Sequence, residues 1–226
     1  MLTKVIDLTQ LLNEKMTVYP DTTPPTFVVT NTVEKNGYRE HQISMLSHTG
    51  THIDAPCHIL LDGKSLDQFS MNKFIGRAMV IDCKGRHEIS FDYLQTFESK
   101  IAEVDFILFY TGWQNKWNTS GYFEDCPIPT KEAAHYLTGF KLKGVGLDAF
   151  SLDKINSAFA VNEENLPNHH ILLKKEIILI ENLTNLDKLP EFGFTFQGFP
   201  LKVENADGSP VRAVAVIDEY HNQNSH

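Results

Sequence analysis

The segment from Ser47 to His58 concentrates side chains that bind metal ions. It reads S-H-T-G-T-H-I-D-A-P-C-H and contains four of them: His48, His52, Asp54 and His58. All four stand at even positions, so an extended chain would point them to one face. The flanking threonines and Ile53 favour an extended chain, and Pro56 opposes a helix. The pattern predicts a metal site on one face of a strand.

Gly50 explains how one strand could bring two imidazoles to one ion. A fully extended chain would separate the backbones of His48 and His52 by roughly 13 Å, at about 3.3 Å per residue. Metal–ligand bonds are only about 2 Å long, so that separation is near the limit. Glycine can adopt the backbone angles of a bulge or turn, which would shorten the distance.

Neither a purely structural role nor a different catalytic motif accounts for this segment as well as a metal site does. Four ligand-type side chains on one face would be costly to bury without a partner. No glutamate follows His48, which argues against the helical HExxH zinc motif, and no GxSxG elbow is present. Cys57 should face away from His58 and is expected to fill space rather than act as a nucleophile. The remaining isolated histidines are expected not to bind metal: His41, His87, His135 and His221.

The composition favours a small-molecule partner. We predict a single domain over residues 1–226, because this length suffices for one sizeable core. Acidic residues outnumber basic ones by 29 to 20, the net charge is −9, and no Lys/Arg run interrupts this balance. Binding to nucleic acid or to an anionic membrane needs clustered cations, so neither is expected.

Nothing in the sequence predicts secretion or membrane insertion. The N-terminus lacks the apolar core of a signal peptide, and no stretch approaches the roughly 20 apolar residues of a membrane span. The three cysteines form no CxxC pair and predict neither a disulfide framework nor a zinc ribbon. A cytoplasmic protein is therefore expected.

Strands should dominate the fold that positions these residues. The runs FILFY and IILI are apolar at every position, which indicates strands covered on both faces, as in an α/β or layered β/α architecture. Short apolar runs rich in β-branched residues predict strands at 26–33, 78–83, 106–111, 144–150, 177–180 and 211–217.

Two helices and one hairpin complete the expected elements. Apolar residues at helical spacing follow Thr130, a plausible N-cap, and a second helix should hold residues 171–175. Residues 194–203 and 209–217 flank Ala206-Asp207-Gly208, which is typical of a hairpin.

Taken together, these motifs resemble one protein family. HTGTHIDAPCH is similar to the HxGTHxDxPxH signature of the cyclase-like metal hydrolases, which include bacterial kynurenine formamidase and isatin hydrolase. The resemblance continues in order through VIDLTQ, YTGW, GVGLDAFSLD, NHHILL, LIENLTNLDKLP and FPLKVENADGSPVRAVAVI. It implies an α/β fold of the layered, swivelling β/β/α type with a mixed, β-rich core. It also implies a homodimer or a larger oligomer such as a homotetramer.

The resemblance implies a centre with two divalent metal ions. His48, His52 and Asp54 match ligands of one ion, and Asp54 would bridge to the second. His169 matches a ligand of the second ion, and Glu181 matches another bridging carboxylate. Zinc is usual in the formamidase branch of the family, and manganese occurs among isatin hydrolases.

These assignments predict an amide hydrolase. A water held between two ions would be deprotonated near neutral pH and could attack a carbonyl carbon. His58 matches the family's proton donor and acceptor, and a neutral imidazole can pass a proton to the leaving nitrogen. The first hypothesis is hydrolysis of an aryl formamide, with N-formylkynurenine yielding kynurenine and formate. The alternatives are a cyclic amide such as isatin, another small amide or lactone, or a metal- or ligand-binding protein without turnover.

Tyr19 occupies the position of an aromatic clamp. The formamidases resemble one another in a tryptophan before a Pro-Gly-Asp element, and here the element is Y-P-D-T. A tyrosine can still stack on an aryl ring and bind substrate, although its ring is smaller. The alternative is a tyrosine that merely packs in an N-terminal loop. The residue after the last signature histidine also departs from the family, since it is often Phe and is Ile59 here.

The neighbours His169 and His170 compete for one ligand position. Adjacent residues on a helix point about 100° apart, so one compact site should take only one of them. LPNHHILL resembles the family's His-x-x-Leu-Leu element in a register that places the ligand at His169.

Overall fold

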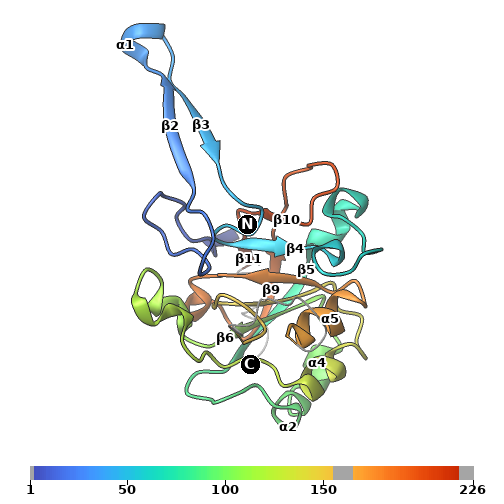
Figure 1. The fold of residues 1–226 in the computed structure, drawn as a ribbon. Coiled ribbons are helices and arrows are strands. Elements are labelled where there is room, and N and C mark those ends of the chain that lie inside the picture. Colours follow the sequence, from blue (N-terminus) through green and yellow to red (C-terminus); the bar gives the residue numbers. More distant parts are fainter. Residues whose placement is uncertain (1–2, 155–164, 219–226) are drawn as a thin grey trace.

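The computed structural model describes residues 3–154 and 165–218. Its main feature is a nine-stranded sheet with the order β1-β11-β9-β5-β6-β7-β8-β4-β10 (Figure 1). The four strands β5 to β8 run parallel, and every other pair in the sheet is antiparallel. The strands are β1 (Thr3–Asp7), β4 (His52–Asp54), β5 (Ile75–Asp82), β6 (Phe106–Tyr110), β7 (Gly144–Leu147), β8 (Ile178–Glu181), β9 (Phe192–Gln197), β10 (Gly208–Pro210) and β11 (Val214–Asp218).

The central strands are buried on both faces, as their uniform apolarity predicts. Along β6, Phe106 and Leu108 pack into one apolar cluster, whereas Ile107 and Phe109 pack into the other. This alternation follows from the two-residue period of a strand, which points successive side chains to opposite faces. The predicted α/β fold with a mixed, β-rich core is confirmed.

Short helices cover one face of the sheet (Figure 1). Thr130 caps α4 as predicted, because its hydroxyl accepts a hydrogen bond from the Ala133 amide at 3.2 Å. α5 begins earlier than the predicted range 171–175, since Pro167 stands at its first position, where a missing N–H costs nothing. The α-helices are α1 (Val33–Asn36), α2 (Phe91–Gln95), α3 (Glu98–Ile101), α4 (Lys131–Leu137) and α5 (Pro167–Leu173). The 3₁₀ helices are η1 (Pro56–His58), η2 (Leu66–Gln68), η3 (Met71–Phe74), η4 (Trp113–Lys116), η5 (Ser120–Phe123) and η6 (Leu186–Lys188).

Several predicted strands are shorter than their apolar runs. The run 144–150 leaves the sheet after Leu147, because buried Asp148 accepts hydrogen bonds from the Thr111 amide and hydroxyl at 2.8 and 2.6 Å. The run 26–33 ends at Asn31, and Val33 begins α1 instead. Local hydropathy cannot predict the contact between Asp148 and Thr111, because the two residues are far apart in the sequence.

The predicted hairpin around Asp207 is present, but its two strands are joined by a long connection. β9 and β11 do pair antiparallel, and a bridge between Pro200 and Val211 extends their register. The loop beyond that bridge is wide, because β10 leaves β11 and pairs with β4. Pro210 suits such a place, since β10 is an edge strand and proline offers no ladder hydrogen bond.

A separate two-stranded arm rises from the body of the molecule (Figure 1). It consists of β2 (Thr26–Asn31) and β3 (Glu40–Ser44), with α1 at its tip. Its residues are exposed or only half-buried. Within the described ranges, no helix combines the length and apolarity needed to cross a membrane.

Candidate metal centre

Strand β4 forms the floor of the centre. His52 and Asp54 lie on it, and both are buried. β4 pairs with β8 so that His52 stands opposite Glu181, and with β10 so that Asp54 stands opposite Gly208. The sheet register thus brings together candidate ligands that are far apart in the sequence.

The prediction that all four signature residues share one extended strand is wrong. Gly50 turns the chain with φ +66°, so His48 precedes the strand and folds back toward it. The positive φ favours glycine, and a Cβ at Gly50 would lie 2.5 Å from Leu12 Cδ2, so the Leu12 side chain would have to move. His58 ends the 3₁₀ helix η1, which Pro56 begins. The glycine turn that the sequence predicts is therefore present, and it reverses the chain so that His48 lies beside Asp54.

Asn182 holds this turn in place. Its side-chain amide donates to the Gly50 carbonyl at 2.9 Å, and its Oδ1 accepts from the Tyr122 hydroxyl at 2.7 Å. Its own carbonyl accepts from the Thr51 hydroxyl at 2.6 Å. Asn182 follows Glu181 directly, so the turn and the carboxylate share one anchor.

Each of the two buried carboxylates divides its oxygens between two groups of imidazoles. Asp54 Oδ1 lies 2.7 Å from His48 Nδ1 and 3.2 Å from His52 Nε2, and Asp54 Oδ2 lies 3.6 Å from His169 Nε2. Glu181 Oε2 lies 3.5 Å from His52 Nε2, and Oε1 lies 3.4 Å from His169 Nε2. Two donor sets result, one of His48, His52 and Asp54 and one of Asp54, His169 and Glu181.

Asp153 orients His169. Its Oδ2 lies 2.7 Å from His169 Nδ1 and also accepts from the His169 amide at 3.0 Å. This leaves Nε2 facing Asp54 and Glu181, as in the carboxylate–histidine–metal arrangement of many metal sites. His170 turns elsewhere, because its Nδ1 donates to the Leu166 carbonyl at 2.9 Å. The structure thus brings His169, and not His170, to the cluster.

His58 lies at the edge of the cluster. Its ring centroid is 4.0 Å from that of His48 and 6.3 Å from that of His169. Burial is the main reason that the pKa of His58 falls to about 4; Asp54 opposes the shift, and the neighbouring His48 adds to it. His58 is therefore neutral at pH 7, the form that can accept a proton. It also shares a third donor set with His48 and Asp207, so its proton-transfer role stays a prediction.

The buried charges of the centre call for cations. Burial alone would lower the pKa of His48, but Asp54 and Asp207 outweigh it and raise that pKa to about 10. Burial likewise opposes the charged form of Asp54, yet the adjacent His52 and His48 hold its pKa well below the usual range. Imidazole nitrogens with carboxylate oxygens form a donor set that suits zinc or manganese. The residues present therefore fit divalent metal ions.

Two acids of the site were not predicted as functional. Asp207 Oδ2 lies 3.0 Å from His48 Nε2 and 3.7 Å from His58 Nδ1. Asp153 holds His169. Both stand in segments that resemble the family, ADG and GLDAFSLD, but local pattern assigns them no partner.

Tyr19 is 41% exposed, and its ring meets Phe123 edge-on at 6.0 Å between centroids. Burial raises the pKa of Tyr19, and the charge of Glu181 adds to that shift while His169 opposes it. Contact with a substrate stays a prediction.

The isolated histidines that are expected not to bind metal lie outside the donor sets wherever the structure describes them. His41, His87 and His135 are exposed, and His221 lies outside the described residues. All three cysteines are free thiols. Burial raises the pKa of the Cys57 thiol, which disfavours the thiolate that a nucleophile requires.

Comparisons with known proteins show the family to which the chain belongs. The sequence profile of the Cyclase family, described as "Putative cyclase", matches residues 6–154. Kynurenine formamidase of Geobacillus thermodenitrificans is 36% identical over 210 residues, which cover 92% of this chain and 95% of that protein. The chain belongs to the Cyclase family.

Solved structures support the same grouping. Isatin hydrolase A from Ralstonia solanacearum superposes with a TM-score of 0.82 at 27% identity, covering 96% of this chain and 92% of that chain. A solved structure described as a potential metal-dependent hydrolase with cyclase activity gives 0.74 at 28% identity, covering 96% and 100%. The prediction that this Cyclase family member is a metal-dependent hydrolase is confirmed.

Proposed function

We propose that the protein is a binuclear metal hydrolase that cleaves an aryl formamide, with N-formylkynurenine as the first candidate substrate. The observation that carries the proposal is the division of Asp54 and Glu181 oxygens between two imidazole groups. A carboxylate placed in this way suits a bridge between two ions. Similarity to a kynurenine formamidase along nearly the whole chain supports the substrate class.

The two ions would take different ligands. His48 and His52 would hold one ion, His169 would hold the other, and Asp54 and Glu181 would bridge them. Zinc is the first expectation and manganese the second. Bound divalent ions supply Lewis acidity, which lowers the pKa of water and polarises a carbonyl oxygen.

His58 would move the proton. Its Nδ1 lies 3.7 Å from Asp207 Oδ2, which leaves Nε2 to accept a proton from the attacking water and return it to the leaving nitrogen. Its pKa, lowered by burial, keeps this nitrogen unprotonated at neutral pH. Tyr19, whose ring packs against Phe123, would contact the aryl ring of the substrate.

A substrate comparison tests the proposal. Purified enzyme loaded with zinc or manganese should release kynurenine from N-formyl-L-kynurenine, followed by the absorbance of kynurenine, and a chelator should abolish the activity. A higher kcat/KM for isatin, followed by loss of its colour, would favour the cyclic amide, which the similarity to isatin hydrolase A supports. Tight metal binding without turnover of any small amide or lactone would instead favour a binding protein.

Metal analysis tests the binuclear part separately. Protein prepared with saturating metal should approach two equivalents per chain, because two donor sets converge on shared carboxylates. A reproducible single equivalent would contradict the bridging roles of Asp54 and Glu181.

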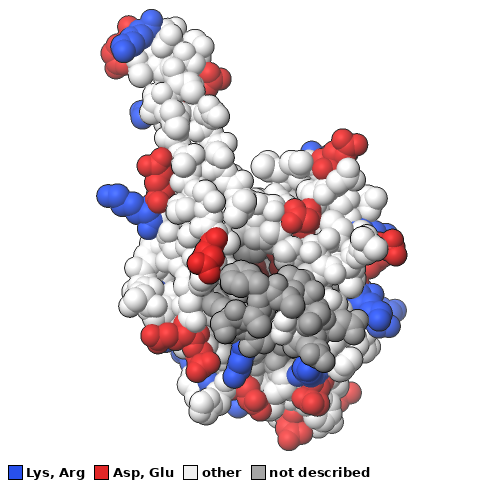
Figure 2. Space-filling view, viewed as in Figure 1, with Lys and Arg blue, Asp and Glu red and all other residues white. Residues whose placement is uncertain are grey.

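We also propose that the enzyme assembles as a homodimer or homotetramer and that its two-stranded arm contributes to the contact. One face of the arm carries Phe27, Val29 and Ile43, which share a side because Phe27 stands opposite Ile43 in the antiparallel register. Val29 and Ile43 are 44% and 53% exposed. Figure 2 shows a mostly uncharged stem below the charged tip of the arm.

A further inference from the structure

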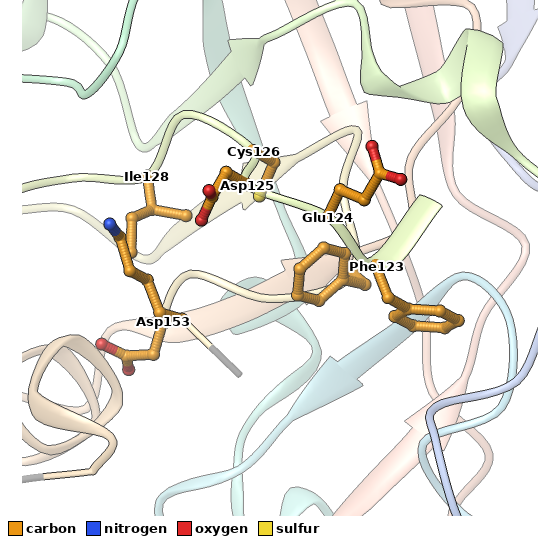
Figure 3. A pocket seen from close by; sticks show the side chains of 8 residues that line it. Phe123, Glu124, Asp125, Cys126, Ile128 and Asp153 are labelled. Carbon is orange, nitrogen blue, oxygen red and sulfur yellow. The ribbon is translucent and has the colours of Figure 1, made fainter. Parts of the chain in front are cut away.

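A cavity of about 290 Å³ lies beside the metal centre. Its size is near the lower end of small-ligand pockets, roughly 300–1,000 Å³. Figure 3 shows residues that line it, among them Phe123, Asp125 and Asp153. None of the ligand assignments above uses this cavity.

The cavity and the metal centre share one residue in their walls. Asp153 lines the cavity and at the same time holds His169 Nδ1 at 2.7 Å. Leu152, its neighbour, donates its amide to Glu181 Oε1 at 3.3 Å. On the other side, Phe123 meets the ring of Tyr19. The cavity and the metal centre therefore have Asp153 in common and lie next to each other.

The lining combines aromatic rings with two exposed acids, Glu124 and Asp125, and one exposed base, Lys154. Phe123 and Phe150 have centroids 5.2 Å apart and present apolar surface. Asp125 and Lys154 line the same cavity and are both exposed. The second acid, Glu124, diverges from Asp125 in Figure 3, and its carboxylate lies against Gly121. Asp125 and Lys154 are therefore the charged pair that a ligand would meet.

We propose that this cavity receives a zwitterionic α-amino-acid group carried by the aryl ring of the substrate. This inference rests on the proposed function of the metal centre. Asp125 binds the ammonium, Lys154 binds the carboxylate, and the two phenylalanines contact the carbon skeleton between them. A neutral substrate such as isatin gains nothing from the charged pair, so the enzyme selects aryl formamides that bear an amino acid.

Two substrates that differ only in the amino acid test this inference. The pair is N-formyl-L-kynurenine and 2′-formamidoacetophenone, which keeps the ring, the ketone and the formamide. Asp125→Asn and Lys154→Gln should each raise KM for the first substrate about 3- to 30-fold, as expected for a partly exposed charged hydrogen bond. They should leave kcat and the kinetics of the second substrate nearly unchanged.

Matched controls lie on the exposed surface of α4. Glu132→Gln and Lys131→Gln remove the same kinds of charge away from the cavity and should change neither substrate's kinetics. Equal effects of the cavity variants on both substrates, or no effect on either, would overturn the inference while the proposed function stands.

Failure of the proposed function has a different signature. Wild-type enzyme would then hydrolyse neither formamide. Binding of L-kynurenine to the metal-loaded protein, measured by calorimetry, still tests the cavity. Weaker binding by Asp125→Asn and Lys154→Gln supports it, and undetectable binding by wild type contradicts it.

Discussion

At the scale of single residues, the centre contains two kinds of histidine. His52 is buried between Asp54 and Glu181, whereas His58 lies at the edge with a ring that only approaches His48. Both types are imidazoles in one motif, so their roles differ through position and not through chemistry. Substitution can separate the two roles.

His58→Ala should keep most of the bound metal while losing rate. General acid–base groups contribute about 10²–10⁴-fold, and kcat should fall within that range. His52→Ala should instead lose metal and activity together, because it removes a donor from the floor of the centre. Metal content by mass spectrometry beside kcat distinguishes the two. If His58→Ala empties the site as well, His58 is itself a metal ligand, through the donor set that it forms with His48 and Asp207.

His169 and His170 give a second test at this scale. His169→Ala should strip one ion, whereas His170→Ala should leave both, because only His169 faces Asp54 and Glu181. Asp153→Asn should weaken metal binding about 10- to 100-fold, as loss of an outer carboxylate does in other metal sites. The measurement is a competition titration against a chelating dye. Loss of metal from His170→Ala alone would contradict the placement of α5.

At the scale of elements, the turn before β4 determines whether the ligands meet. Gly50 has φ +66°, and the Leu12 side chain occupies the position that a Cβ would take. The Asn182 side chain donates a hydrogen bond to the Gly50 carbonyl. The turn brings His48 back toward Asp54, to a distance of 2.7 Å. A strand without this turn would carry His48 out of reach.

Gly50→Ala should lower both stability and metal affinity. Strain of this kind costs on the order of 1–3 kcal/mol, and the added Cβ must also displace Leu12. Gly37→Ala is the control, because Gly37 has φ +78° at the arm tip and open space around it. It shares the backbone strain but neither the collision nor the metal centre. Thermal unfolding with and without metal measures both, and equal metal affinity of the two variants would contradict this role of Gly50.

At the scale of the whole molecule, the arm stands apart from the core. A two-stranded hairpin is marginally stable on its own in water, and this one exposes an apolar face. A second copy of the chain would cover that face and stabilise the hairpin.

Charging the arm should therefore break the assembly. Val29→Lys together with Ile43→Lys should convert an oligomer to a monomer, measured by light scattering after size exclusion. Gln42→Lys is the control, since Gln42 pairs with Val28 on the opposite face. A wild-type chain that is already monomeric at micromolar concentration would contradict the proposed oligomer.

Local features of the sequence predicted the core strands and a candidate metal-binding segment. That segment was predicted from the spacing of His48, His52, Asp54 and His58, and the family resemblance added His169 and Glu181. Uniformly apolar runs identified strands buried on both faces, and Thr130 identified the start of α4. These features are local, because hydrophobic period and capping depend on neighbours a few residues away.

Contacts between distant segments follow from strand pairing in the tertiary structure, which local sequence patterns do not predict. The β4–β8 register sets His52 opposite Glu181, and β10 leaves β11 to pair with β4, which brings Asp207 to His48. Asp153 binds His169, which lies 16 residues further along the chain. A strand's own sequence fixes which face a side chain occupies, but its partner strand is fixed by packing of the whole sheet. Local pattern therefore predicted candidate ligands, and long-range strand pairing placed the residues that contact them.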